Sequence, residues 1–142
     1  MAEKIFENEY VICELDESVP LLKHRWLQEP SSHDFKKNLL KILKKYEELK
    51  DSYDNLMWLA HTALLGELDE EVEQWLNSTW DALLFKKAGV KVHAVILGSD
   101  IFADYPMEKF KHKAEKKFSE LGVKLDVFPN EERAYAWLKS QK

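Results

Sequence analysis

The stretch Asn55-Leu56-Met57-Trp58-Leu59-Ala60 decides the fold class of this chain. It is almost wholly apolar and too short for a helix, which is typical of a strand covered on both faces. A second segment of this kind, Val90-Lys91-Val92-His93-Ala94-Val95-Ile96-Leu97, follows further along the chain. Strands buried on both faces belong to parallel sheets flanked by helices, so the two segments predict an α/β protein with residues 55–60 central in its sheet.

Helical patterns precede each of these strands. Between Phe35 and Leu49 apolar residues recur at steps of three and four while lysines fill the other face, which predicts a helix of about five turns. The segment Pro30-Ser31-Ser32 supplies its start and a serine cap. A second apolar stripe, Val72 to Leu84, follows the acidic residues Asp69-Glu70-Glu71, and Gly89 is its expected end.

The C-terminal third continues the alternation of strands and helices. Apolar residues between Met107 and Leu121 predict a third helix, and Gly122 ends it. Val123 to Phe128 is the last predicted strand. The turn Pro129-Asn130 then caps a final helix, Glu131 to Lys139.

The N-terminal part predicts an antiparallel hairpin. Tyr10 to Leu15 and Val19 to Leu27 are β-rich, and the turn-prone Asp16-Glu17-Ser18 lies between them. Pro20 has no N–H to donate, so it belongs at the beginning of its strand or on an open edge. The order is therefore ββαβαβαβα: a mainly parallel five-stranded sheet with its first strand antiparallel at an edge, and four helices.

Composition and charge narrow the class of protein. The 142 residues are 45% hydrophobic, which is typical of one ordered domain, here residues 1–142. A net charge of -5 disfavours nucleic acid and acidic membranes as partners. The charged segment Met1 to Tyr10 is unlike a signal peptide, and no apolar run is long enough for an integral membrane segment. The single cysteine, Cys13, fits a reducing compartment, so we expect a cytoplasmic protein.

The sequence contains no catalytic or cofactor motif: no GxSxG elbow, phosphate-binding glycine loop or metal-ligand spacing of histidines. We therefore expect a protein that is not an enzyme and holds no metal or cofactor. Candidates for ligand contact follow predicted strands, where the loops of parallel sheets open toward ligands. They are His61 and the turn Gly98-Ser99-Asp100. An enzyme acting through His61 with Ser99 or Asp100 stays open as an alternative, provided that these groups lie within hydrogen-bond reach.

Tryptophans are the other candidates for a binding role. Trp75 and Trp80 lie on the second predicted helix, with Trp26 and Trp58 nearby in the expected fold. Tryptophan suits pockets and interfaces because it is large and has one polar group. Two interpretations stay open: core residues, or an exposed cluster that forms a dimer contact or a lipid-sized apolar pocket. His93 lies inside a strand, where we expect a partly buried and hydrogen-bonded side chain.

Several segments together resemble a known family. They are the strand end Arg25-Trp26, the central run Asn55 to Ala60, the helix segment Glu73 to Trp80, the strand approach Ala88 to Val92, and the terminal Glu132 to Leu138. In their order and spacing they resemble the small bacterial SpoIIAA-like, or STAS/SEC14-like, domains, and the resemblance covers nearly the whole chain. It implies a superhelix of βα units with a mixed sheet, and a regulatory or binding module rather than an enzyme.

The resemblance also points to Thr62. In STAS-type anti-sigma-factor antagonists an acidic residue followed by Ser or Thr, after the central strand, is the phosphorylation switch. Here that stretch is Leu59 to Ala63. Thr62 supplies the nearest hydroxyl group, and His61 occupies the position where the acidic residue is expected. We therefore expect a regulatory or protein-interaction domain without a clear phosphoswitch. The alternative is a binder of a small hydrophobic ligand or lipid, and a homodimer is also left open.

Overall fold

The computed structural model describes residues 2–66, 68–97 and 122–141, and these residues contain a six-stranded mixed sheet. Neighbouring strands are consecutive in sequence. β1 to β3 are antiparallel, whereas β3 to β6 run parallel. The strands are β1 (Ala2–Glu7), β2 (Val11–Asp16), β3 (Leu21–Trp26), β4 (Met57–His61), β5 (Val92–Ile96) and β6 (Lys124–Phe128).

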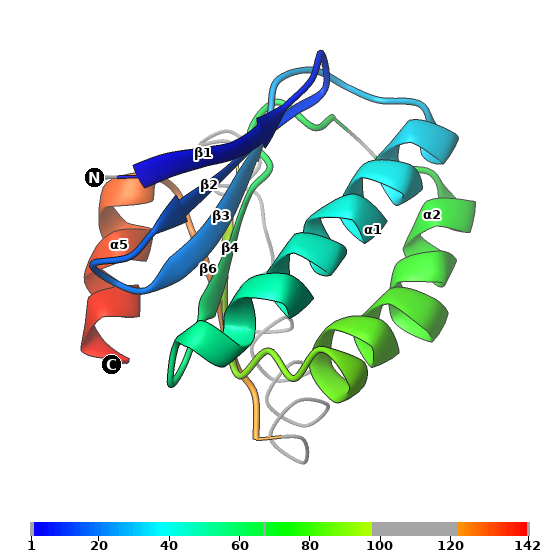
Figure 1. Cartoon of the computed structure of the whole chain (residues 1–142). Coiled ribbons are helices and arrows are strands. Elements are labelled where there is room, and N and C mark those ends of the chain that lie inside the picture. The colour runs from blue at the N-terminus through cyan, green and yellow to red at the C-terminus, as the bar shows by residue number, and fades with distance from the viewer. Residues whose placement is uncertain (1, 67, 98–121, 142) are drawn as a thin grey trace.

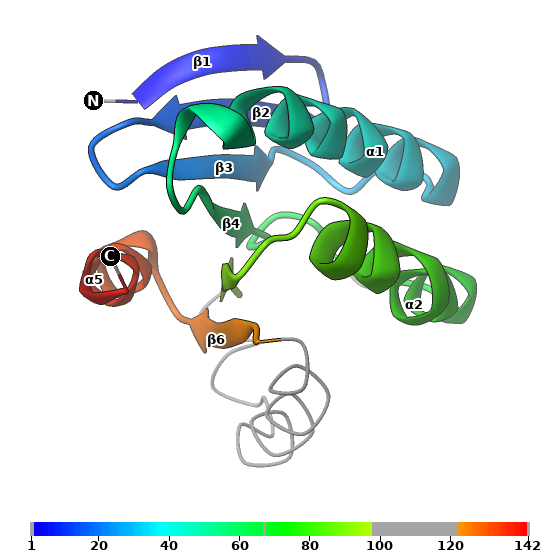
Figure 2. The same cartoon turned by 60° about the horizontal axis from the view of Figure 1, so that its bottom comes forward.

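Helices cover both faces of the sheet. Figures 1 and 2 show α1 (Ser32–Leu49) and α2 (Glu70–Trp75) on one face and α5 (Glu131–Ser140) on the other. The helical segment that begins with α2 continues to residue 87 through the π-helical turns Leu76–Trp80 and Ala82–Lys87. The crossovers from β3 to β4 and from β4 to β5 both step to the next strand in the same direction. One handedness therefore places α1 and α2 on the same face.

The α-helices α1, α2 and α5 each begin at a side-chain cap, and the capping residues explain where these helices start. Ser31 accepts a hydrogen bond from the Asp34 N–H before α1, Asp69 from Val72 before α2, and Asn130 from Arg133 before α5. A cap of this kind stabilises a helix by about 1 kcal/mol. The segment 70–87 ends before Gly89, whose φ of +77° is a left-handed conformation that glycine adopts without strain.

Two apolar layers hold the structure together. The larger one lies between the sheet and the α1 and α2 helices and includes Trp26, Trp58 and Trp80. The smaller one lies beneath α5 and includes Met57, Leu59 and Leu138. β4 contributes to both layers and is buried along most of its length, which confirms the central strand predicted from residues 55–60. Burial of one large apolar side chain stabilises a fold by roughly 1.5–3 kcal/mol.

Most of the predicted elements are present within the described residues. The hairpin is confirmed as β2 and β3, and Pro20 directly precedes β3. The predicted strand 123–128 and the helix from Glu131 are β6 and α5. The predicted third helix, Met107 to Leu121, lies outside the described residues. The described residues contain three α-helices, α1, α2 and α5. No helix of the described part of the chain is long and apolar enough to cross a bilayer.

The prediction of five strands was wrong, because Ala2–Glu7 forms a sixth strand, β1. Consequently β2 is not at the edge of the sheet: it pairs with β1 on one side and β3 on the other. Three of the six residues of β1 are charged, and its pairing is irregular between Lys4 and Phe6. A charged edge strand with a bulge lacks the strict alternation by which strands are found in sequences.

Candidate functional site

The carboxyl ends of the parallel strands form the first candidate site. β3 ends near Arg25, β4 ends at His61 and β5 at Ile96, and Arg25, His61 and Ile96 are neighbours in the ladder. α5 starts directly after β6, so its N-terminus lies at the same end of the sheet. Loops at the carboxyl ends of parallel strands are the usual place for ligands in open α/β sheets. We call this region, with the loop 62–66, the carboxyl edge.

Thr62 ties two strands together at the carboxyl edge. Its hydroxyl donates to the Ile96 carbonyl oxygen at 2.7 Å, and its backbone N–H donates to the same oxygen at 2.9 Å. The hydroxyl therefore has a structural partner. A phosphate on Thr62 would remove this donor and place about two negative charges at the end of β4 and β5.

His61 lies half-buried on the face of the sheet that α5 covers. Its pKa is lowered, chiefly by burial; Glu131 opposes this shift, whereas Arg25 and Lys23 add to it. His61 is therefore mainly neutral at pH 7. Its Nδ1 is shielded from solvent and has no hydrogen-bond partner among the residues that the structure describes.

Lys23 links the carboxyl edge to α5. Its ammonium lies 2.9 Å from a carboxylate oxygen of Glu131 and 5.1 Å from the centre of the Tyr135 ring. Burial opposes a charge on Lys23, but the contacts with Glu131 and Tyr135 prevail and raise its pKa to about 12. Tyr135 in turn donates to Asp16 at 3.1 Å. These contacts explain how a short helix is held on the sheet over only a small apolar layer.

Arg25 is the cation of this edge that remains exposed. It has no ion pair within 4 Å among residues 2–66, 68–97 and 122–141, whereas Lys23 is paired and His61 is mainly neutral. The arrangement offers charge and hydrogen-bond donors for recognition. Gly98, Ser99 and Asp100 lie outside the described residues, so their approach to His61, which the enzyme alternative requires, stays a prediction.

The predicted tryptophan candidates lie on the opposite face of the sheet. Trp80 is buried, with ring centres 5.9 Å from Trp58 and 5.8 Å from Trp75. Trp75 is half-buried and has the Lys36 ammonium 5.7 Å from its ring centre. Trp26 is also buried. The core interpretation thus applies to Trp26, Trp58 and Trp80, and Trp75 closes the cluster toward solvent.

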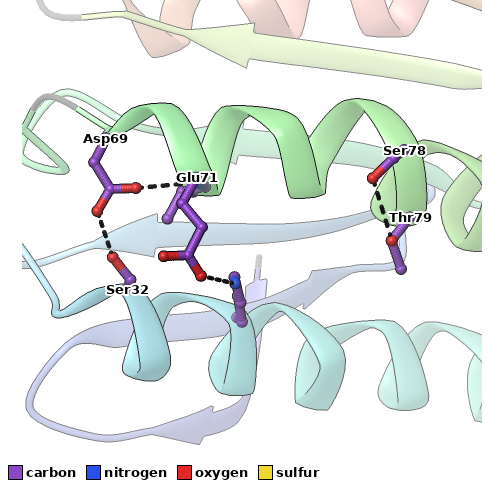
Figure 3. Close-up of polar contacts among 7 residues, drawn as sticks. Ser32, Asp69, Glu71, Ser78 and Thr79 are labelled. Atoms are coloured by element: carbon purple, nitrogen blue, oxygen red, sulfur yellow. Dashed lines mark hydrogen bonds and ion pairs between the residues drawn. The ribbon is translucent and has the colours of Figure 1, made fainter.

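Polar contacts fix the start of the helix that carries these tryptophans. Ser32 donates to the Asp69 carboxylate at 2.8 Å, and Lys36 lies 3.2 Å from Glu71, so the N-terminal turns of α1 and α2 are joined (Figure 3). Further along, Ser78 and Thr79 approach each other at 3.4 Å. The first two contacts join the starts of α1 and of the segment 70–87, in addition to the apolar layer that both share.

Sequence reasoning missed two features of these sites. Lys23 was not singled out and Arg25 was named only as part of a strand end, although alternation along β3 places both on the face opposite His24. His24 was not identified as a core residue, and His93 is more deeply buried than expected, with an Nδ1 that lacks a partner within the described residues. The described residues contain no group of three or more His, Cys, Asp or Glu that could hold a metal ion.

Comparisons of this chain with protein-family models, with curated proteins and with solved structures found no match. The interpretation of both sites therefore depends on the chemistry of the residues described above.

Proposed function

We propose that this chain is a regulatory or protein-interaction domain that docks an acidic segment of a partner protein at the carboxyl edge. The observation that carries the proposal is the exposed Arg25 beside His61 at the ends of two neighbouring strands. The guanidinium binds carboxylates through two parallel hydrogen bonds, and arginine is common among residues that dominate protein interfaces. The SpoIIAA-like resemblance supports a binding role, and the consecutive order of β2 to β6 is consistent with it.

The loop after β4 adds an apolar contact to this surface. Leu64 is 60% exposed and lies two residues after Thr62. The loop closes against the segment that follows β3: a Cβ added at Gly66 would lie 2.8 Å from Glu29 Cδ. An exposed apolar side chain and an exposed arginine at the same edge of the sheet suit a small docking surface.

A cytoplasmic location is part of this proposal, and it is supported by the presence of a single cysteine, which cannot form an internal disulfide. Cys13 is a free, fully buried thiol, and burial raises its pKa to about 12. A thiol of this kind is inert and packs as a small apolar residue.

The test is affinity capture from a lysate of the source cells with three baits: the wild-type chain, Arg25→Glu, and Lys41→Glu as a control. Lys41 lies on α1, near Phe6, on the opposite face of the sheet from His61. We expect a protein that is retained by the wild type and by Lys41→Glu and lost with Arg25→Glu. Equal retention of the same proteins by all three folded baits would contradict docking at the carboxyl edge.

A further inference from the structure

Two histidines lie deep in the layer between the sheet and the segment 70–87. His24 on β3 is 2% exposed and His93 on β5 is 9% exposed. Both flank Trp58 on β4, with ring centres 5.6 Å and 6.4 Å from that indole. The three side chains come from neighbouring strands and form one aromatic cluster, on the opposite face of the sheet from His61.

Both imidazoles are neutral and have an unused hydrogen-bonding atom. Burial lowers the pKa of His24 and of His93 to about 3, so each ring carries one N–H and one lone pair at pH 7. The Nδ1 atoms are shielded from solvent and have no hydrogen-bond partner within the described part of the chain. Buried polar atoms in natural proteins are nearly always paired with protein groups or ordered water, so two unpaired ones side by side with aromatic rings mark a place where a water or a small ligand can bind.

The helical segment 70–87 packs over this cluster and contains π-helical turns. One row of residues that contact the core recurs at steps of four, and Phe85, five residues after Trp80, is buried beside it; the row consists of Val72, Leu76, Trp80, Leu84 and Ala88. An α-helix has 3.6 residues per turn, so such a stripe would drift around it; the wider π-helical turns keep the stripe on one face. π-helical turns are rare and frequently occur at functional sites.

This winding brings two aromatic rings five residues apart onto the same face. Trp80 lies 5.9 Å from Trp58, and Phe85 lies 5.9 Å from His93, between ring centres. The neighbours of His24 in the sheet, Cys13 and Ala60, are by contrast small. The cluster therefore has aromatic walls, which for His24 are Trp26 at 6.0 Å and Trp58, two small residues next to His24 in the ladder, and imidazole nitrogens as its polar groups.

We propose that His24 and His93 line an internal binding site for a small, uncharged, largely apolar molecule that carries one hydroxyl group. Aromatic walls favour an apolar body, and transfer of a charge into such surroundings is strongly unfavourable. A hydroxyl both donates and accepts, so it can bond to Nδ1 in either tautomer of a neutral imidazole. The site is separate from the carboxyl edge, and the proposal does not depend on docking there.

The test uses phenol as the probe and toluene, which is similar in shape but has no hydroxyl, as its control. Each is titrated into ¹⁵N-labelled protein at pH 7, and the imidazole nitrogen signals are followed by NMR. We expect phenol to shift the signals of His24 and His93 but not those of the exposed His33. We also expect phenol to bind roughly two- to tenfold more tightly than toluene, as one net hydrogen bond provides.

Variants assign the preference to the imidazoles. In the double variant His24→Phe/His93→Phe, phenol and toluene should bind equally, whereas His33→Gln should keep the preference for phenol. The wild-type NMR titration decides the question without the variants if the double variant fails to fold. Absence of phenol binding, or equal binding of phenol and toluene to the wild type, would overturn the proposal.

Discussion

Acid should destabilise this protein through its two buried histidines. His24 and His93 titrate near 6.5 when exposed, as in the unfolded chain, and near 3 in the fold. Below pH 6.5 the unfolded state therefore binds protons that the folded state does not bind. Their contribution to stability is complete above about pH 6.5 and is lost progressively as the pH falls toward 3.

The magnitude follows from the width of this window. Each histidine lowers the free energy of unfolding by about 1.4 kcal/mol per pH unit. At pH 4.5, two units below 6.5, each therefore removes about 2.7 kcal/mol and the pair removes roughly 5 kcal/mol. Native domains have about 5–15 kcal/mol in total, so this loss is between about a third and the whole of the stability of a typical domain.

Urea unfolding followed by tryptophan fluorescence measures this loss at pH 7 and at pH 4.5. The decisive comparison is between the wild type and His93→Phe, because groups such as His61 titrate in both and cancel in the difference. The variant should lose about 2.7 kcal/mol less than the wild type over this range. His33→Gln, which removes an exposed histidine, should behave as the wild type. Equal losses in the wild type and His93→Phe would refute the reasoning.

Other substitutions test the local structure by urea unfolding. Thr62→Val should lower the free energy of unfolding by about 0.5–1.5 kcal/mol because the hydrogen bond to the Ile96 carbonyl is lost. The control Thr79→Val, at an exposed position, should have little effect, and equal effects of the two variants would contradict a stabilising role of the Thr62 hydrogen bond. Gly66→Ala and Gly89→Ala should each destabilise by about 1 kcal/mol, because both glycines have a positive φ that alanine adopts only with strain, and unchanged free energies of unfolding would contradict this. Asp69→Ala should cost about 1 kcal/mol through the lost cap, and an unchanged midpoint would show that the cap is not needed.

Much of the fold could be predicted because its signals are local. The capping residues Ser31 and Asn130 and the end of the segment at Gly89 depend on residues close by in sequence. The buried run of β4 predicted a central strand because both of its faces are apolar. β1 could not be found in this way: it is stabilised by its pairing with β2, which is a contact between segments and not a property of its own residues.

The candidate sites were less predictable. His61 and Thr62 were identified because they follow the central strand, but the contact of Lys23 with Glu131 joins segments far apart in sequence. The π-helical turns are reflected in the sequence by aromatic residues spaced five apart, Trp75, Trp80 and Phe85. The helix prediction considered only steps of three and four residues, so it did not use this spacing. The neutral state of His24 and His93 depends on burial by several elements, so residue type alone could not reveal it.

The most direct test of docking at the carboxyl edge is photo-crosslinking in the source cells. A photoreactive amino acid is placed at Leu64, which is 60% exposed in the loop 62–66 of the carboxyl edge, or at Leu40, which is 44% exposed on α1 and serves as the control. We predict one crosslinked partner from position 64 that is absent from position 40 and reduced when Arg25→Glu is added. Crosslinks of equal yield from both positions, or a partner found from position 40 alone, would contradict it.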